Sequence, residues 1–378
     1  MNEDLKDKTL DELEQTVVDL GQKKYLAGYI FDFIHVQGAS EVSQITPLSK
    51  AFRAQLIEQG YRISRLEVMN KLTDKDGTIK YVFALDTGRI ETVLLHDGGR
   101  KTLCVSTQVG CAMGCRFCAT AKIPFQQNLT AGQIVDQVNL VCSVPVRASR
   151  STDSLPVIQN HGRDAHVTET PHGVTTNRIS NIVYMGMGEP LASYGAVLKS
   201  LRILNHPKGK NIGIRHITVS TCGLVPAIRR LADEDMLPRL AISLNAPTDE
   251  LRTRLMPIGA KYPIADLLAA VRFYQSRTRQ RVTFEYVMIR DMNDLAEHAK
   301  MLLKRLEGIS YNVNLIEHNP FPGCEFAGSS GARIKQFASI LDRAGIETTV
   351  RFRMGRGIKA ACGQLGAGWL NEQGGPAK

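Results

Sequence analysis

The chain has 378 residues, a length typical of two domains or of one large barrel with an appendage. Hydrophobic residues make up 43% and charged residues 22%, which excludes a fully disordered chain. Lys and Arg outnumber Asp and Glu by 47 to 37, and the resulting formal charge of +10 indicates an acidic partner such as nucleic acid. The chain has no long apolar run and begins with an acidic, helix-like stretch, so we expect neither a membrane-spanning helix nor a signal peptide.

Eight cysteines in a chain without a secretory signal indicate reduced thiols and a cytoplasmic protein. Four of the eight fall within fifteen residues, whereas a disulfide framework is spread more evenly. The clustering therefore favours metal or catalytic chemistry. The cysteines are Cys104, Cys111, Cys115, Cys118, Cys142, Cys222, Cys324 and Cys362.

The N-terminal part, residues 1–70, is predicted to be a small helical domain. Thr9 and Glu12 form a capping-box signature, and apolar residues then recur at helical spacing. Residues 71–96 are expected to be a connector containing a β-hairpin, because apolar residues alternate on either side of a turn at Thr87 and Gly88.

Short β-branched runs alternate with helical stretches over residues 97–350. This alternation indicates parallel βαβ units, either doubly wound or barrel-like. We expect strands at Thr102–Ser106, Ile179–Met185, Ile214–Ser220, Leu240–Asn245, Arg281–Ile289, Asn312–Glu317 and Thr348–Arg353. We expect helices at Ala131–Cys142, Tyr194–Asn205, Pro226–Asp233, Ile264–Arg277, Asp294–Glu307 and Gly331–Ala344. Residues 143–178 lack any period and are interpreted as a surface insertion, and residues 351–378 as a C-terminal segment.

Cys111, Cys115 and Cys118 form a CxxxCxxC array, and three thiolates on one tight loop suit a soft metal. A structural zinc site normally takes a fourth protein ligand, and no second CxxC or CxxH pair occurs in the chain. An iron–sulfur cluster with one iron left open is the favoured interpretation. Zinc, or three free thiols, are the alternatives.

The array, with Phe117 before its last cysteine, resembles the signature of radical S-adenosylmethionine (SAM) enzymes. The Gly-Met-Gly-Glu-Pro turn (186–190) is similar to the segment that holds the SAM amino group in that family, and polar residues end the next two strands. The resemblance implies a [4Fe-4S] cluster and SAM as cofactors on a partial (β/α) barrel. It also implies these SAM-binding residues: Gly188, Glu189, Ser220, Ser243, Leu244, Asn245 and Asn319.

Further segments narrow the resemblance to the RlmN type of adenine C2 methyltransferases, with the Cfr-type C8 enzymes as relatives. They are Leu-Met-Pro-Ile (255–258), Val-Thr-Phe-Glu-Tyr (282–286), Asn-Pro-Phe-Pro (319–322) and Ala-Ala-Cys-Gly-Gln-Leu (360–365). The resemblance, which includes the N-terminal helical domain, implies methylation of C2 of adenosine in the peptidyl-transferase region of 23S rRNA and in tRNA, with residues 1–70 assisting in RNA binding. It also implies two SAM per turnover and an electron donor such as flavodoxin or ferredoxin.

The same resemblance implies three catalytic roles. Cys362 receives a methyl group from a first SAM, and a radical made from a second SAM activates that group for attack on adenine. Cys104 then resolves the protein–RNA crosslink by forming a disulfide with Cys362, and Glu91 accepts the proton. The chain departs from the family pattern at Asn245, where histidine is usual.

Basic residues form three groups that suit phosphate neutralisation, although each is also compatible with a solvated helix face. They are Lys199, Arg202, Lys208, Lys210, Arg215, Arg229 and Arg230; Arg272, Arg277, Arg279 and Arg281; and Arg351, Arg353, Arg356 and Lys359. The last group leads directly to Cys362. Two alternatives to an RNA methyltransferase are a radical SAM methylthiotransferase and a zinc-stapled, non-enzymatic RNA-binding protein.

Overall fold

The computed structural model describes residues 3–143, 178–351 and 354–370, so the 143–178 insertion lies outside the described residues except for its two end positions. Ten strands form one sheet in the order β14-β13-β12-β11-β10-β9-β6-β5-β4-β3. The seven strands from β14 to β6 are parallel to their neighbours, and β5, β4 and β3 continue the sheet antiparallel. The two edge strands do not pair with each other, which confirms a partial barrel.

The parallel strands lie close to the predicted runs. They are β6 (Arg100–Cys104), β9 (Asn181–Tyr184), β10 (Ile217–Thr221), β11 (Arg239–Ser243), β12 (Val282–Met288), β13 (Tyr311–Glu317) and β14 (Thr348–Arg351). The expected strand from Ile214 instead begins with a 3₁₀ turn at Ile214–His216, because pairing with β9 starts only at Ile217. The central positions of the parallel strands are buried, as expected for strands that helices cover.

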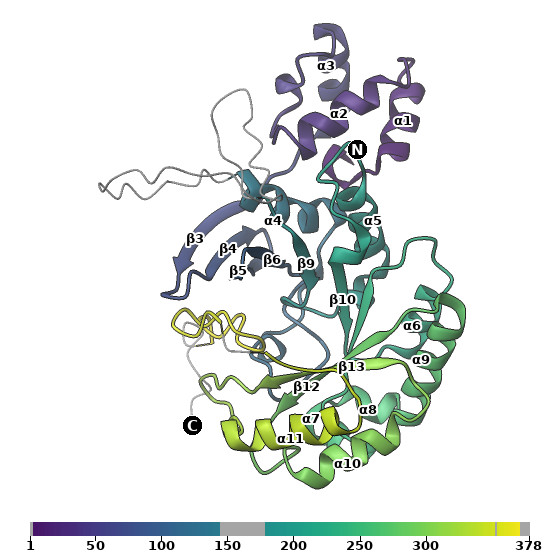
Figure 1. Cartoon of the computed structure of the whole chain (residues 1–378). Helices are drawn as coiled ribbons and strands as arrows, with labels where there is room; N and C mark the ends of the chain where they lie inside the picture. The colour runs from purple at the N-terminus through teal and green to yellow at the C-terminus, as the bar shows by residue number, and fades with distance from the viewer. Residues whose placement is uncertain (1–2, 144–177, 352–353, 371–378) are drawn as a thin grey trace, which may run out of the picture.

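Helices follow the strands and lie on the outside of the curved sheet (Figure 1). The main helices are α4 (Ala131–Ser143), α5 (Tyr194–Asn205), α6 (Val225–Leu231), α9 (Ile264–Thr278), α10 (Ala296–Arg305) and α11 (Gly331–Arg343). Two short helices that the sequence did not predict, α7 (Asp249–Leu255) and α8 (Ile258–Lys261), follow β11. Among the described residues, no helix is both long and apolar enough to cross a membrane.

The N-terminal helices form a separate lobe above the sheet in Figure 1. They are α1 (Leu10–Asp19), α2 (Leu26–His35) and α3 (Lys50–Glu58), and a short parallel pair, β1 (Glu3–Asp4) with β2 (Tyr61–Arg62), joins their two ends. The capping box of Thr9 and Glu12 is confirmed, since each side chain accepts the backbone N–H of the other residue. Leu10, Leu13 and Val17 form the buried face of α1.

The expected hairpin is confirmed as β4 (Ile79–Leu85) and β5 (Gly88–Asp97). A third antiparallel strand, β3 (Glu67–Thr73), precedes it at the edge of the sheet. The sequence did not predict β3 and expected a helical region to continue to residue 70. Nearly all of β3 is exposed, so it lacks the alternation of apolar and polar residues that identifies a half-buried strand. A second small pair, β7 (Gln108–Val109) with β8 (Gln127–Asn128), flanks the cysteine loop.

A buried ion pair joins the N-terminal lobe to the barrel. Lys6 Nζ lies 2.5 Å from Asp136 Oδ1, and only 3% of each side chain is exposed. Lys6 also donates to the carbonyl of Ser64, and the other oxygen of Asp136 accepts the Leu66 N–H at 2.7 Å. Asp136 lies on α4, so this pair holds the first residues, the end of the lobe and a barrel helix together.

Replacing Lys6 with alanine should lower the free energy of unfolding by about 3–5 kcal/mol, because it leaves the Asp136 carboxylate buried without its cation. Urea unfolding measures this change. Lys24→Ala, which removes an exposed pair with Glu14, is the matched control and should change the midpoint little. Equal effects of the two substitutions would contradict the interpretation of the buried pair.

Candidate active site

One cavity lies inside the partial barrel, and sulfur and polar side chains line it. Most of the predicted site residues lie on its wall: Cys111, Cys115, Cys118, Gly188, Glu189, Ser220, Ser243, Asn245 and Cys362. The other four, which the structure also describes, lie off this wall: Glu91, Cys104, Leu244 and Asn319. The fold therefore brings segments from residue 111 to residue 362 to one place.

A tight turn brings the three clustered cysteines to this wall. Gly114 adopts a φ of +70°, a conformation that favours glycine, and the Cys118 N–H donates to the Cys115 carbonyl at 3.1 Å. The Arg116 N–H donates to the Leu255 carbonyl at 3.0 Å, which attaches the loop to the end of α7. The loop is thus held by backbone bonds, and its thiols remain directed to the cavity.

The environment of these thiols favours their neutral form unless a cation is present. Burial raises the pKa of all three, that of Cys111 to about 12, and the pKa of Cys115 is raised further by the two neighbouring thiols. Among the described residues, no three His, Cys, Asp or Glu side chains lie close enough to hold a single metal ion. Three thiols on one wall fit the donor set of an iron–sulfur cluster, whose positive irons stabilise the thiolate forms.

The Gly-Met-Gly-Glu-Pro turn follows β9 and is held rigidly. Gly188 has a φ of +101°, and a Cβ there would lie 2.5 Å from Cβ of Gln108, so only glycine fits. The buried Glu189 accepts the backbone N–H groups of Leu191 at 3.0 Å and Cys222 at 2.7 Å. Desolvation raises the pKa of Glu189, and these two hydrogen bonds oppose that rise. The carboxylate thus ties the turn to the end of β10.

Ser220 and Ser243 line the cavity from the ends of β10 and β11, as expected. Asn245 also lines it, with a φ of +61°, but its amide is engaged with the protein: Oδ1 accepts the Val287 N–H at 2.8 Å, and Nδ2 lies 3.1 Å from the sulfur of Met256. Leu244 has its side chain in the core. Because both polar atoms of its amide already have protein partners, the main contribution of Asn245 is to the shape of the cavity wall.

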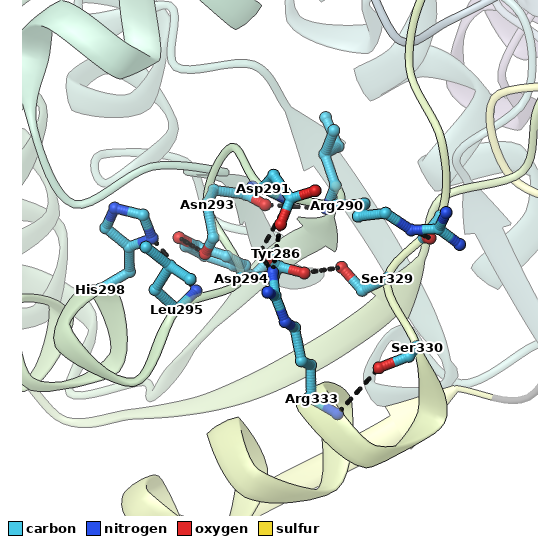
Figure 2. Close-up of polar contacts among 12 residues, drawn as sticks. Tyr286, Arg290, Asp291, Asn293, Asp294, Leu295, His298, Ser329, Ser330 and Arg333 are labelled. Atoms are coloured by element: carbon cyan, nitrogen blue, oxygen red, sulfur yellow. Dashed lines mark hydrogen bonds and ion pairs between the residues drawn. The ribbon is translucent and has the colours of Figure 1, made fainter.

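A polar network beyond the end of β12 holds Asn245 in this conformation. Asn293 Nδ2 donates to the Asn245 carbonyl at 2.8 Å, and the Tyr286 hydroxyl donates to the Asn293 carbonyl at 2.8 Å. Figure 2 shows the same network continuing through Asp294, which accepts from Ser329 at 2.8 Å and from Arg333 at 3.0 Å. The network fixes the chain between β12 and α10, and with it one side of the cavity.

The segment around Cys362 packs directly on the cysteine loop. The Ala119 N–H donates to the Gly363 carbonyl at 2.7 Å, and the Thr120 hydroxyl donates to the Leu365 carbonyl at 2.9 Å. Asn319 Nδ2 donates to the Cys362 carbonyl at 3.2 Å, so Asn319 positions this segment. Cys362 is exposed and also lines the cavity.

Carboxylates of the antiparallel strands hold the same segment from the other side. Asp76 and Asp74, in the β3–β4 turn, accept the N–H groups of Gly355 at 2.8 Å and Gly357 at 2.9 Å. In the C-terminal direction, Glu91 Oε2 accepts the Gly366 N–H at 2.9 Å. These bonds join residues about 280 positions apart and fix the segment on both sides of Cys362.

Glu91 and Cys104 are buried residues that do not line the cavity, whereas Cys362 does. Glu91 Oε1 is paired with Lys80 at 3.0 Å, and both side chains are almost fully buried. Cys104, at the end of β6, is buried, and desolvation raises its pKa. An ionised Cys362 raises that pKa further, so the two thiols lie within electrostatic range of each other.

Several basic residues noted in the sequence are neutralised by acidic neighbours. Six of them lie 2.6–4.0 Å from a carboxylate: Lys199 with Glu12, Arg202 with Asp235, Arg230 with Glu234, Arg277 with Asp233, Arg281 with Glu347, and Arg351 with Glu285. Arg353 lies outside the described residues. The surface near these pairs is less positive than the sequence suggests, and their contact with RNA stays a prediction.

Sequence reasoning missed Lys80, Asp74, Asp76 and Glu285. The two aspartates look like ordinary turn residues, and only the fold reveals their partners. Glu285 did carry a signal, since it is an acidic residue in the middle of the apolar strand β12.

Comparison with known proteins agrees with these observations. Residues 173–303 match the Radical SAM superfamily, and residues 3–61 match the Ribosomal RNA large subunit methyltransferase N-terminal domain. The chain is 42% identical over 360 residues to the probable dual-specificity RNA methyltransferase RlmN of Geobacillus kaustophilus, covering 95% of this chain and 91% of that protein. It is 43% identical over 362 residues to the dual-specificity RNA methyltransferase RlmN of Syntrophobacter fumaroxidans, covering 96% and 97%.

A solved structure is similar as well. The crystal structure of a radical SAM methyltransferase from Sphaerobacter thermophilus superposes with a TM-score of 0.82 at 42% sequence identity. The match covers 96% of this chain and 99% of that one. The similarity therefore includes the N-terminal lobe, the sheet and the C-terminal segment.

Gly357→Ala should loosen the segment that carries Cys362. The added Cβ would lie 2.6 Å from Asp74 Oδ1, so the carboxylate must move away from the Gly357 N–H, and loss of that hydrogen bond costs on the order of 1 kcal/mol. Hydrogen exchange at the amides of residues 355–366 should become faster. Gly368→Ala is the control, because a Cβ there meets open space. Unchanged exchange in Gly357→Ala would show that the β3–β4 turn does not hold the segment.

Proposed function

The chain belongs to the RlmN family of radical SAM RNA methyltransferases, and on that premise we propose that it methylates C2 of adenosine in 23S rRNA and in tRNA. The observation that carries this proposal is the meeting of Cys362 with the CxxxCxxC loop on one cavity wall, with Cys104 as a buried neighbour. A reaction that uses a protein thiol beside a cluster needs this arrangement. The reaction is expected to take place in the cytoplasm, where the RNA substrates are found.

Cys111, Cys115 and Cys118 would hold a [4Fe-4S] cluster, one iron each. SAM would bind beside it against Gly188, Glu189, Ser220, Ser243 and the backbone near Leu244, with two molecules used per turnover. Cluster and SAM together would supply one-electron chemistry, driven by a reduced donor such as flavodoxin or ferredoxin. Everything else in the reaction depends on groups of this chain.

Cys362 would carry the methyl carbon as a thioether before that carbon reaches adenine. This step is needed because C2 of adenine has no nucleophilic electron pair for direct displacement. Asn319 and the Gly363 carbonyl contact orient the Cys362 backbone toward the cavity. Attachment to the base would leave Cys362 covalently joined to RNA.

Cys104, once deprotonated, would release the product by attacking the Cys362 sulfur: the S–S bond forms as the carbon–sulfur bond breaks, and the departing carbon takes the electron pair and a proton to become the methyl group. A dithiol reductant would then return the disulfide to two thiols. Burial keeps the Cys104 thiol protonated, so it would be protected from reaction with solvent oxidants until the crosslink forms. Thiol–thiol exchange of this kind requires that the two sulfurs be neighbours.

Glu91 is proposed as the proton acceptor. Its carboxylate is held by Lys80 and by the Gly366 N–H. Acceptance of a proton would weaken its pairing with Lys80, because a neutral acid no longer attracts the ammonium group. Proton transfer would therefore be linked to the position of the C-terminal segment.

Two alternatives give different products. A Cfr-type enzyme would methylate C8, and we favour C2 because Asn-Pro-Phe-Pro (319–322) and the segment around Cys362 are more similar to the C2 enzymes. A zinc-stapled RNA-binding protein would give no methylated nucleoside.

Incubation of the reconstituted protein with SAM, a reductant and 23S rRNA fragments or tRNA should yield 2-methyladenosine. Mass spectrometry of the digested nucleosides measures it. Cys115→Ala should lose both iron and product. Formation of 8-methyladenosine instead would support the Cfr-type reaction, and a colourless protein that binds zinc and forms no product would support the binding protein.

Cys104→Ala should stop after attack on adenine and purify with RNA covalently attached through Cys362. Cys362→Ala should form no adduct, since no thiol is available to carry the methyl carbon. Ribonuclease digestion followed by mass measurement of the peptide that contains residue 362 distinguishes the two variants. An adduct in Cys362→Ala, or no adduct in Cys104→Ala, would show that the two cysteines have the opposite roles or that the mechanism is wrong.

A further inference from the structure

A row of polar side chains crosses the inside of the sheet at one level. Ser243 on β11 is in register with Glu285 on β12, and Glu285 is in register with Asn314 on β13. Residues in register across parallel strands lie on the same face of the sheet. Ser243 and Glu285 both line the cavity, so this face is its floor.

Glu285 is a buried carboxylate with one oxygen left over. Its Oε1 accepts from Asn314 Nδ2 at 2.8 Å and lies 3.9 Å from Arg351 Nη2. Its Oε2 is buried and has no hydrogen-bond partner among the described residues. Only 4% of the residue is exposed, so solvent does not satisfy this oxygen. Buried carboxylates of folded proteins are normally satisfied, which points to a donor from outside the chain.

The unsatisfied oxygen lies near the reacting thiol. Glu285 and Cys362 both line the same cavity, and the Arg351 guanidinium that lies 3.9 Å from Glu285 Oε1 belongs to the edge strand β14. The donor must therefore come from a molecule that occupies the cavity beside Cys362. Phosphate and carboxylate groups are excluded, because they lack a donor and carry the same charge as Glu285.

We propose that Oε2 of Glu285 accepts a hydrogen bond from an adenosine group in the cavity, through the exocyclic N–H of adenine or a ribose hydroxyl. The proposal rests on the proposed function, since both SAM and the RNA substrate bring an adenosine to this site. Glu285 is not among the cofactor-binding or catalytic residues named above. The carboxylate would select a ligand with a donor at this position over one without it.

Glu285→Gln tests the acceptor without changing shape. Its amide oxygen can still accept a hydrogen bond from Asn314. The NH₂ group that replaces Oε2 is itself a donor, so it cannot accept a hydrogen bond from the ligand. Removing a buried, half-satisfied charge should leave the melting temperature equal or higher. A purely structural carboxylate would instead lose stability without a change in ligand affinity. Glu347→Gln, at an exposed glutamate paired with Arg281, is the matched control for loss of charge.

The experiment uses the cluster-reconstituted full chain and measures equilibrium binding, which needs no turnover. One series uses 5′-methylthioadenosine, which carries the adenosine but not the ammonium group of SAM. The other uses a tRNA fragment with adenosine or purine riboside, which lacks the exocyclic amine, at the target position. Loss of a hydrogen bond to a charged acceptor should weaken binding by about 10- to 100-fold.

Weaker binding of methylthioadenosine to Glu285→Gln would assign the carboxylate to SAM. Loss of the preference for adenosine over purine riboside would assign it to the RNA base, and the wild-type preference itself tests this assignment even if the variant fails to fold. Unchanged affinity in both series would overturn the proposal. These binding measurements do not depend on product formation. Absence of 2-methyladenosine in the activity assay would therefore contradict the proposed function without deciding the role of Glu285.

Discussion

The buried pair of Lys80 and Glu91 determines where the reactive C-terminal segment lies. Two charges that are buried away from water are tolerated only when each has enough hydrogen-bond partners. Besides each other, Lys80 and Glu91 find these partners in the backbone of the C-terminal segment. Lys80 donates to the Lys359 carbonyl at 3.3 Å, and Glu91 accepts the Gly366 N–H. Those two residues bracket Cys362. The antiparallel strands, which add little to the barrel, thus act as the support on which its last segment is placed.

The parallel sheet solves a different problem, which is to gather polar groups that are distant in the sequence. Neighbouring parallel strands end at the same edge, so turns after β9, β10 and β11 all open on one cavity. Bonds between the turns then limit their freedom, as when Glu189 holds the N–H of Cys222. Asn245 serves mainly to hold this geometry, because its amide is bonded to Val287 and Met256.

Local patterns allowed much of the fold to be predicted. The expected helix Tyr194–Asn205 coincides with α5, because its apolar period is clear and prolines bound it on both sides. Features that depend on distant partners were not predictable. The exposed strand β3 has no pattern of its own, and the contacts of Asp76 with Gly355 join positions 279 apart. The motifs located the cavity wall, but they did not indicate that Asn245 would be engaged by Val287 or that Glu285 would keep a spare oxygen.

The sheet is open between β14 and β3, and the segment 354–366 runs from the first of these edges to the turn beside the second (Figure 1). No strand ladder closes this side. Its closure consists of hydrogen bonds from Asp74, Asp76, Glu91 and Lys80 to the backbone of the segment, together with the burial of Ala360 and Leu365 against the core. Opening of this side would break these contacts and leave the strand ladder intact, so its free energy is a local quantity, distinct from that of global unfolding.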